Sequence, residues 1–427
     1  MRRGKPGKPA PARILELDIE RLGTEGAGLA RVESGLVAVP DALPGERVRV
    51  RLDAGRATLI ELLSASPDRV APPCRHFTSC GGCALQHLAA VPYAGFKRGL
   101  IRDALARQGL GDVPVGEPLV SPPSSRRRAN LAARRVGAGV VLGFHGRASH
   151  QIVDLAECSV LRPNLVGLLP PLCGLLSALL RGGESASAIL TETQSGVDLG
   201  LDLPQEPALA ALEALAAFAA SQDLARLWWQ SGGQAPTPAA QRRPVRIRVG
   251  AVEVDLPEGA FLQATAEGEA ALRHAVEQGL GAVKRVADLF AGIGTFALAL
   301  AGGRTIHAAE SDAAALGALA AAARRAGLVQ VSTERRDLEA RPLLPDELTG
   351  FDAVIFDPPR AGARAQAEQL AYSSVPLVIG VSCNPATFAR DAAILTRGGY
   401  VLEGVLPVDQ FLWSSHVELV GRFRRPG

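Results

Sequence analysis

The sequence lacks any run of about 18 uncharged apolar residues, the length that a helix needs to span a bilayer. Its basic start, residues 1–9, is not followed by the apolar stretch of a signal peptide, so we expect a short disordered basic arm there. Both absences argue against a membrane-spanning or secreted protein. The sequence therefore predicts a cytoplasmic location without a membrane partner, and nothing in it suggests an obligate protein partner.

Cysteine is also scarce, with 6 residues in a chain of 427. So few cysteines in so long a chain do not suggest a disulfide framework, and a tight group of them more often binds metal or serves catalysis. Cys74, Cys80 and Cys83 stand in one short run, whereas Cys383 lies far along the chain. The sequence thus predicts two cysteine chemistries, one that holds a cofactor and one that attacks a substrate. The soft thiolates suit an iron–sulfur cluster, and zinc is the alternative.

The length of the chain exceeds one ordinary domain, so two or three domains are expected. From about Arg13 to Leu63, short alternating runs are separated by Gly and Pro, which predicts a small β-barrel. The middle of the chain is mixed, with a predicted helix over 93–108 and a predicted loop over 232–243. From Lys284 onward, apolar runs alternate with helical segments, which predicts parallel strands in a doubly wound α/β domain.

A glycine turn follows the first strand of this predicted α/β domain. In the segment from Asp288 to Thr295, Asp-Leu-Phe-Ala-Gly-Ile-Gly-Thr, glycines let a ligand approach the backbone closely. The third glycine of the dinucleotide-binding pattern is replaced by Ala297. Glu310 ends the next strand, where a carboxylate can accept hydrogen bonds from ribose hydroxyls. The alternative interpretation is a tight turn with a surface acid.

Two further strands end in reactive groups. The run Asp357-Pro-Pro-Arg360 forms a rigid turn where ligands bind in open α/β sheets. Cys383 precedes a proline that can open a helix, so it is predicted to be an exposed nucleophile whose thiolate the helix N-terminus favours. His416 and Glu418 lie on a strand-like run and are predicted to face the same way. The three side chains form a nucleophile and an acid–base set, although a buried cysteine and a solvated polar face remain the alternatives.

Two basic groups are candidate RNA contacts. The net charge of +3 permits a nucleic-acid partner without demanding one, because patches rather than totals steer binding. Arg47, Arg49 and Arg51 are predicted to share one face of a strand, where a solvated face is the alternative. The run Arg126–Arg128 lies in the mixed middle of the chain. Both groups could hold RNA around a target base.

These motifs jointly resemble those of RNA uracil-C5 methyltransferases that use S-adenosylmethionine. The resemblance is strongest to the branch with an N-terminal TRAM domain and an iron–sulfur cluster, whose members act on 23S ribosomal RNA, and it covers nearly the whole chain. It implies transfer of a methyl group to C5 of a uridine in RNA. Ribosomal RNA is favoured over transfer RNA because the transfer-RNA branch typically lacks both the TRAM domain and the cluster cysteines.

The resemblance also implies roles for individual residues. Cys383 is the implied nucleophile, and Glu418 is the implied base that removes the C5 proton. The implied S-adenosylmethionine-binding residues are Gln263, Phe290, Thr295, Glu310, Asp337 and Asp357. The implied ligands of a [4Fe–4S] cluster are Cys74, Cys80, Cys83 and Cys158.

The complete expectation is an α/β protein in three parts behind the basic arm. An OB-like TRAM β-barrel is expected over 10–66. A central α+β domain with the iron–sulfur cluster follows over 67–260. A doubly wound, Rossmann-like methyltransferase domain completes the chain over 261–427.

Three segments depart from the family pattern, and two other functions stay open. The helix expected after Glu310 ends in Ala-Ala-Arg-Arg, where the family usually has Asn-Ala. Thr265 stands where the family usually has Asn, and Phe411-Leu-Trp413-Ser replaces the common Phe-Pro-x-Thr. Trp413 could stack on an RNA base or pack in the core. A cytosine-C5 RNA methyltransferase would usually carry a second cysteine near the Asp-Pro-Pro motif, where this chain has Arg360. A non-catalytic RNA-binding iron–sulfur protein is the other alternative, against which the intact Cys383 and Glu418 argue.

Overall fold

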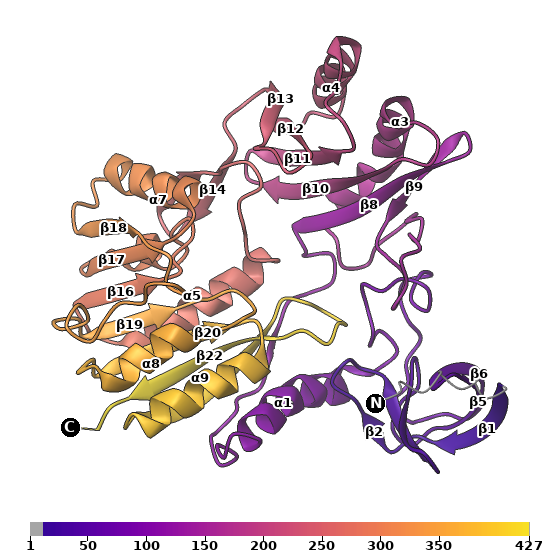
Figure 1. Cartoon of the computed structure of the whole chain (residues 1–427), viewed down its shortest axis with the longest axis horizontal. Coiled ribbons are helices and arrows are strands. Elements are labelled where there is room, and N and C mark those ends of the chain that lie inside the picture. The colour runs from indigo at the N-terminus through magenta and orange to yellow at the C-terminus, as the bar shows by residue number, and fades with distance from the viewer. Residues whose placement is uncertain (1–11, 427) are drawn as a thin grey trace, which may run out of the picture. The chain divides into compact units, whose positions relative to one another are not determined.

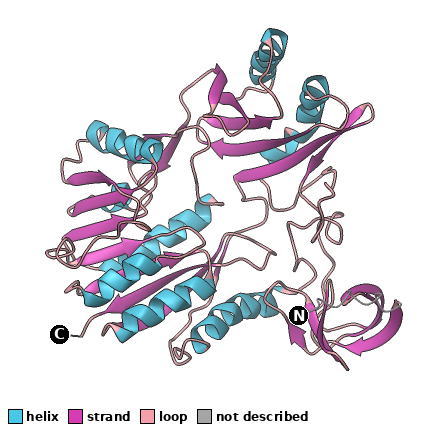
Figure 2. Ribbon diagram, in the orientation of Figure 1, coloured by secondary structure: helices cyan, strands magenta, loops and turns pink. Residues whose placement is uncertain are grey.

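The computed structural model describes residues 12–426 in two compact units, so the predicted basic arm lies outside the described residues. The first unit contains the chain up to Phe96 together with Trp413–Ser415. The second contains Lys97–Leu412 and the chain from His416 onward. Figure 1 and Figure 2 show the elements of both. None of the helices within 12–426 combines the length and the apolar composition needed to cross a bilayer.

Two three-stranded sheets surround one apolar core in the first unit. The core forms because alternate residues turn inward, so that Val48 and Val50 are fully buried between less buried arginines. The predicted small barrel therefore takes the form of two short sheets over a shared core, and two of its strands, β2 and β3, were not foreseen. The sheets consist of β1 (Arg13–Asp18), β5 (Arg47–Asp53) and β6 (Arg56–Ser64), and of β2 (Arg21–Leu22), β3 (Gly28–Val32) and β4 (Gly35–Val39).

The arginine face of β5 is largely occupied by carboxylates. Arg47 and Arg49 bind Glu16 at 3.1 and 2.9 Å, and Arg49 also binds Glu61. The predicted shared face exists, but these ion pairs offset much of its positive charge. This favours the solvated-face interpretation over a dedicated RNA contact.

The loop that contains Cys74, Cys80 and Cys83, here called the cysteine loop, is hydrogen-bonded at its end to a segment near the end of the chain. The Trp413 carbonyl accepts hydrogen bonds from Ala84 N at 2.7 Å and Leu85 N at 2.9 Å. The Trp413 amide donates to the Tyr93 hydroxyl at 2.8 Å. Trp413 is half-buried with a φ of 61°, so its backbone is fixed in a conformation that non-glycine residues rarely adopt.

A six-stranded sheet forms one layer of the second unit, in the order β13-β12-β11-β10-β8-β9. Its strands are β8 (Arg128–Val136), β9 (Gly139–Gly143), β10 (Ser185–Thr193), β11 (Gly196–Leu203), β12 (Arg226–Ser231) and β13 (Thr237–Gln241). Its helices are α2 (Pro163–Gly167), α3 (Leu169–Leu179) and α4 (Leu209–Ser221). The prediction of a loop over 232–243 is only partly confirmed, because β13 occupies its middle and pairs there with β12. As an edge strand, β13 tolerates Pro238, which cannot donate to a ladder.

An eight-stranded sheet forms the core of the second unit, in the order β18-β17-β16-β19-β20-β22-β21-β7. Strands β16 to β20 are parallel neighbours, and β22 is antiparallel to both β20 and β21. The strands are β7 (Leu119–Val120), β16 (Arg285–Leu289), β17 (Thr305–Glu310), β18 (Val331–Arg335), β19 (Ala353–Phe356), β20 (Leu377–Ser382), β21 (Val401–Asp409) and β22 (Glu418–Arg424). A separate hairpin joins β14 (Arg246–Val249) and β15 (Val252–Asp255).

Helices cover both faces of the eight-stranded sheet, as predicted for a doubly wound domain (Figure 1). One apolar cluster packs α5 (Ala266–Leu280), α6 (Ala297–Leu300) and α7 (Ala313–Arg325) against one face. The other packs the end of α1 (Ala90–Ala106), α8 (Arg364–Tyr372) and α9 (Pro385–Arg397) against the opposite face. The strand order reverses between β16 and β19, and in such sheets ligands bind beyond the carboxyl ends of the strands there.

Candidate active site

Cys383 follows the last residue of β20 and precedes α9. Asn384 caps that helix, since its side-chain oxygen accepts a hydrogen bond from Ala386 N at 3.0 Å. The thiol is half-buried rather than exposed. Burial, followed by the nearby carboxylates of Glu418 and Asp357, raises the pKa of Cys383 to about 11. The prediction of an exposed thiolate favoured by the helix N-terminus is therefore wrong for the free protein.

The raised thiol pKa predicts slow alkylation of Cys383 at neutral pH. At pH values well below its pKa of about 11, Cys383 is mostly the unreactive thiol. Its rate of reaction with iodoacetamide should therefore rise about tenfold per pH unit from 7 to 9. Replacing Glu418 with Gln removes one repelling charge and should speed the reaction at pH 8. Peptide mass spectrometry would follow the alkylation of Cys383 itself. A rate that does not change with pH would contradict the prediction.

Glu418 opens β22, directly across from the end of β20. The register pairs Ser382 with Leu419 in antiparallel strands, so Cys383 and Glu418 come at the same edge of the sheet. Glu418 is 3% exposed. Burial and repulsion from Asp357 raise its pKa to about 8, against the opposing effect of a hydrogen bond with Gln410. The carboxyl group is therefore poised to accept a proton near neutral pH.

His416 does not share this environment. It is exposed, whereas Glu418 is buried, so the predicted common facing of the two side chains is not found. Its Nδ1 lies 3.4 Å from Nη2 of Arg360. Val417, between His416 and Glu418, is fully buried, so the chain turns inward just before β22 begins.

A chain of hydrogen bonds joins three side chains beside the thiol. Gln410 Nε2 donates to Gln263 Oε1 at 2.5 Å, and Gln263 Nε2 donates to Asp357 Oδ2 at 3.3 Å. Asp357 follows β19, and its amide donates to Leu289 O at 3.2 Å. Burial raises the pKa of Asp357, so its charge is costly in the free protein. The structure thus brings together Gln263, Asp357 and Glu418, while Gln410 had not been foreseen.

Thr265, the departure next to Gln263, has a structural role. It caps α5, because its hydroxyl accepts a hydrogen bond from Gly268 N at 2.9 Å. The hydroxyl also lies 2.8 Å from that of Ser121, and the amide donates to Gln410 Oε1 at 3.3 Å. The side chain is 1% exposed, so it supports the strand-end residues rather than contacting a ligand.

The glycine turn after β16 is braced by two carboxyl groups. Asp288 is fully buried, its Oδ2 accepts from Ala297 N at 2.8 Å, and burial raises its pKa to about 8. Glu310 Oε2 accepts from Gly292 N at 2.9 Å. Gly294 has a φ of 94°, and an added Cβ would lie 2.8 Å from Leu319, so glycine is required there.

The other predicted cofactor residues lie at or near this turn. Phe290 follows β16 with a φ of 61°, and Thr295 is half-buried two residues before α6. Glu310 Oε1 also accepts from Ser311 N and Asp312 N at 2.6 and 2.8 Å, so the carboxylate holds the ends of two strands together. A role of Glu310 toward ribose stays a prediction.

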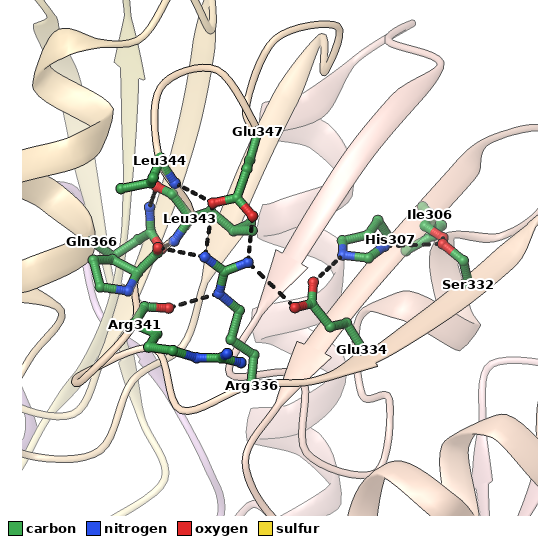
Figure 3. Close-up of polar contacts among 11 residues, drawn as sticks. Ile306, His307, Ser332, Glu334, Arg336, Arg341, Leu343, Leu344, Glu347 and Gln366 are labelled. Carbon is green, nitrogen blue, oxygen red and sulfur yellow. Dashed lines mark hydrogen bonds and ion pairs between the residues drawn. The ribbon is translucent and has the colours of Figure 1, made fainter.

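Asp337 lies on an exposed loop after β18 that a neighbouring arginine braces. Its Oδ1 accepts from Glu339 N and Ala340 N at 3.0 and 3.2 Å. Figure 3 shows Arg336 between Glu334 and Glu347, with both Glu347 oxygens bound at 2.6 and 2.8 Å. The hydrogen bonds from Arg336 hold the pKa of Glu347 at about 2. The loop is therefore ordered by charge pairing before any ligand is bound.

The three arginines of the run Arg126–Arg128 have different surroundings: one is buried in an ion pair, and the other two line a cavity. Arg127 is buried and binds Glu269, so the prediction that it contacts RNA is wrong. Arg126 and Arg128 instead lie 5.8 and 5.4 Å from the ring centres of Phe411 and Phe261. A cavity of about 200 Å³ is lined by Arg126, Arg128, Ala129, Asn130, Ile189, Phe261, Leu262, Ala264 and Phe411.

A larger cavity of about 470 Å³ lies by the β14–β15 hairpin, and its lining includes three arginines. Arg243 binds Asp223 at 2.9 Å, and Arg246 binds Asp255 at 2.8 Å. Arg248 lies 3.7 Å from Glu253. Each positive charge there has a carboxylate partner, so this cavity gives no anion site comparable to the smaller one.

The four predicted metal ligands are divided between the two units. Cys80 and Cys83 are buried in the first unit, where Gly82 N lies 3.4 Å from Cys80 Sγ. Cys74 is half-buried, with its amide bound to Gln86 Oε1 at 3.2 Å, and Cys158 belongs to the second unit. Across residues 12–426, no group of three or more His, Cys, Asp or Glu side chains has the arrangement needed to hold a metal ion.

Comparison with known proteins gives matches over both ends of the chain. Residues 11–58 match the TRAM domain, and residues 245–423 match the family described as tRNA (uracil-5-)-methyltransferase. A Brucella suis protein named as an uncharacterized RNA methyltransferase is 46% identical over 95% of this chain and 96% of its own. The 23S rRNA (uracil(1939)-C(5))-methyltransferase RlmD of Chromohalobacter salexigens is 37% identical over 97% of this chain and 90% of its own.

The crystal structure of a Pyrococcus abyssi tRNA (uracil-54, C5)-methyltransferase with S-adenosyl-L-homocysteine has a similar fold. Its TM-score is 0.74 at 23% identity, over 96% of this chain and 100% of that one. The doubly wound sheet with its glycine turn and strand-end carboxylates defines an S-adenosylmethionine-dependent methyltransferase. The chain belongs to the RNA uracil-C5 methyltransferase family.

Proposed function

We propose that this enzyme methylates C5 of a uridine in 23S ribosomal RNA through a covalent bond between Cys383 and C6 of the base. The observation that carries the proposal is the pairing of β20 with β22, which places Cys383, the residue directly after β20, opposite Glu418, the first residue of β22. A nucleophile and a buried carboxyl group of raised pKa at one sheet edge suit a reaction that needs both.

The chemistry follows from the weakness of uracil C5 as a nucleophile. The Cys383 thiol releases its proton to solvent, and the thiolate adds to C6. This addition forms a C6–S bond and moves the C5=C6 electron pair toward O4, which makes an enolate. S-Adenosylmethionine supplies the methyl group that C5 takes up, and S-adenosylhomocysteine is left. Glu418 accepts the C5 proton, the C–H electrons restore the C5=C6 bond, and the C6–S bond breaks. Covalent catalysis thus replaces one difficult step by easier ones.

The ribosomal substrate is supported by the relative named as a 23S rRNA methyltransferase, which matches the chain from the TRAM region onward. Transfer RNA is the second candidate, since the similar crystal structure carries a tRNA methyltransferase name. The test is methyl transfer from labelled S-adenosylmethionine to unmodified 23S rRNA and unmodified tRNA, with nucleoside mass spectrometry. 5-Methyluridine in the ribosomal RNA alone is expected. 5-Methyluridine in tRNA alone would overturn the substrate, and 5-methylcytidine would overturn the reaction.

The cavity beside Gln263 is where we place an RNA base next to the target. Phe261 is 65% exposed, while Arg126 and Arg128 supply positive charge beside it. Aromatic rings and arginines of this kind bind unstacked bases in single-strand sites. Leu262 and Ala264, which flank Gln263, also line the cavity, so its contents lie close to the catalytic groups.

Replacing Arg126 and Arg128 with alanine should weaken RNA binding by about 10-fold or more and leave S-adenosylmethionine affinity unchanged, because each removes a phosphate- or base-binding cation. The matched control is Arg127→Met, which should instead destabilise the fold, because the buried Glu269 loses its ion pair with Arg127 and keeps only the 3.8 Å contact with Arg273. Filter binding of RNA and thermal denaturation separate the two effects. Unchanged RNA affinity in the double alanine variant would contradict the assignment.

We further propose that Cys74, Cys80 and Cys83 hold a [4Fe–4S] cluster, while the role of Cys158 as a ligand stays a prediction. The donor set fits, because three thiols lie within ten residues, two of them are buried, and an amide N–H lies near Cys80 Sγ. The cluster would stabilise the cysteine loop rather than enter the reaction.

Analysis of iron and acid-labile sulfide in anaerobically purified protein tests this proposal. Four of each per chain are expected in the wild type, with a large loss in Cys80→Ser and none in Cys173→Ala, whose thiol lies on α3. Zinc in place of iron, or no metal at all, would overturn the cluster.

A further inference from the structure

We propose that Lys97 is a positioning residue for proton removal: it fixes both ends of the loop between β21 and β22, and so places Gln410 and Glu418. The inference rests on the proposed function, since it gives Glu418 the role of base. Lys97 lies on α1, and no sequence motif singles it out.

Lys97 is a fully buried ammonium group with partners at three points of this loop. Its side chain and that of Asp409 are both 0% exposed, and Nζ lies 2.9 Å from Asp409 Oδ1. Nζ also donates to the carbonyls of Phe411, at 3.4 Å, and His416. An ammonium group has three protons to donate, so it can bind all three oxygens at once.

The three residues that Lys97 binds lie close to Gln410 and Glu418 in the sequence. Gln410 lies between two of them, and it binds Gln263 at 2.5 Å as well as hydrogen-bonding to Glu418. His416 precedes Glu418 by two residues. Asp409 Oδ1 also accepts from Phe411 N at 3.0 Å, so one buried pair fixes the turn that begins the loop.

Fixing the backbone at both ends matters because proton transfer depends steeply on distance. A base displaced by about 1 Å can lose about 10²-fold in rate. Thiolate addition depends less on this loop, because Cys383 is held by β20 and by Asn384 at the start of α9, and the loop reaches its surroundings through the contact of His416 with Arg360. Loss of the Lys97 anchor should therefore slow proton removal while adduct formation continues.

The test compares Lys97→Met with the wild type in a single turnover on uridine-containing RNA. The variant should accumulate a methylated protein–RNA adduct that resolves about 10- to 100-fold more slowly. Its trapping rate on 5-fluorouridine RNA, which carries no C5 proton, should stay within about threefold of wild type, a much smaller change than in resolution. The matched control is Arg98→Met, the next residue on α1, whose partner Glu117 lies on the surface.

A double variant, Lys97→Met with Asp409→Asn, removes both charges of the buried pair, so any remaining effect comes from lost positioning. It also replaces the single variant in the test if that variant does not fold. The side-chain amide introduced at position 409 is neutral and can still accept from Phe411 N, so only the anchoring of the two carbonyls is missing. Slow resolution in the double variant supports the inference. Wild-type resolution in the double variant, or equal slowing of trapping and resolution in Lys97→Met, overturns it. Failure of the wild type to form any adduct would instead overturn the proposed function.

Discussion

Replacing Cys383 with alanine is expected to lower the rate of methyl transfer by more than about 10⁴-fold, because the variant lacks the thiol that we propose forms the C6 adduct. Covalent trapping by 5-fluorouridine RNA should disappear in the same variant. S-Adenosylmethionine should bind with unchanged affinity, since the glycine turn that is predicted to hold it is built by Asp288, Glu310 and the backbone. The measurements are single-turnover methyl transfer, a denaturing gel for the adduct, and calorimetry for the cofactor.

Cys173→Ala is the matched control for this variant. Cys173 is also half-buried, but it lies on α3 beside the six-stranded sheet, and burial raises its pKa as well. The control variant should therefore keep full activity and full trapping. Persistence of a covalent adduct in Cys383→Ala would refute the assignment of the nucleophile, whereas loss of activity in the control would point to a general effect of cysteine removal.

Much of the catalytic fold could be predicted because its strands are locally unambiguous. The apolar runs at 353–356 and 377–381 lie in β19 and β20, since strands buried on both faces leave little room for polar residues. The strand expected over 305–310 is found as β17. The residues at the ends of these strands then meet by topology alone, because parallel strands share one carboxyl edge. That is why Asp357 and Glu310 could be placed without any knowledge of tertiary contacts.

The ionisation of Cys383 could not be predicted in the same way. The helix N-terminus after it is visible in the sequence, but a helix end carries only about half a unit of positive charge. Burial is the main cause of the raised pKa of the thiol, and two carboxylates from other strands add to its effect. Burial and the two carboxylates, which depend on the tertiary structure, outweigh the local effect of the helix N-terminus, so the thiol stays protonated at neutral pH.

Side chains that act across the fold were missed for a related reason. Lys97 meets Asp409 across 312 residues, and Gln410 meets Gln263 across 147. A lysine on a helix or a glutamine after a strand has no local pattern that separates it from a solvated residue. The run of arginines shows the same limit, because the burial of Arg127 depends on its pairing with Glu269, which only the packing of α5 brings into reach.

Replacing Glu418 with glutamine is expected to lower kcat by about 10²–10⁴-fold and to leave the enzyme attached to its methylated product. The amide keeps the size of the side chain but cannot accept the C5 proton, so addition and methyl transfer proceed and elimination stalls. Mass spectrometry of the trapped complex should show RNA that carries both the methyl group and the protein. Glu403→Gln is the matched control, since Glu403 lies on neighbouring β21 in a surface pair with Arg424 at 2.6 Å.

The pH dependence provides a second, independent readout of the same residue. The carboxylate is the active form, and a pKa raised to about 8 leaves most of the group protonated at pH 7. The rate of adduct resolution should therefore rise with pH through 8 and level off only above it. Glu418→Gln should lose this rise, because nothing remains to ionise in that range at this position. If the variant resolves its adduct at the wild-type rate, or if the rise with pH survives the substitution, another group removes the proton. Asp357 would then be the next residue to replace, because burial raises its pKa as well and its carboxyl group acts on both Cys383 and Glu418.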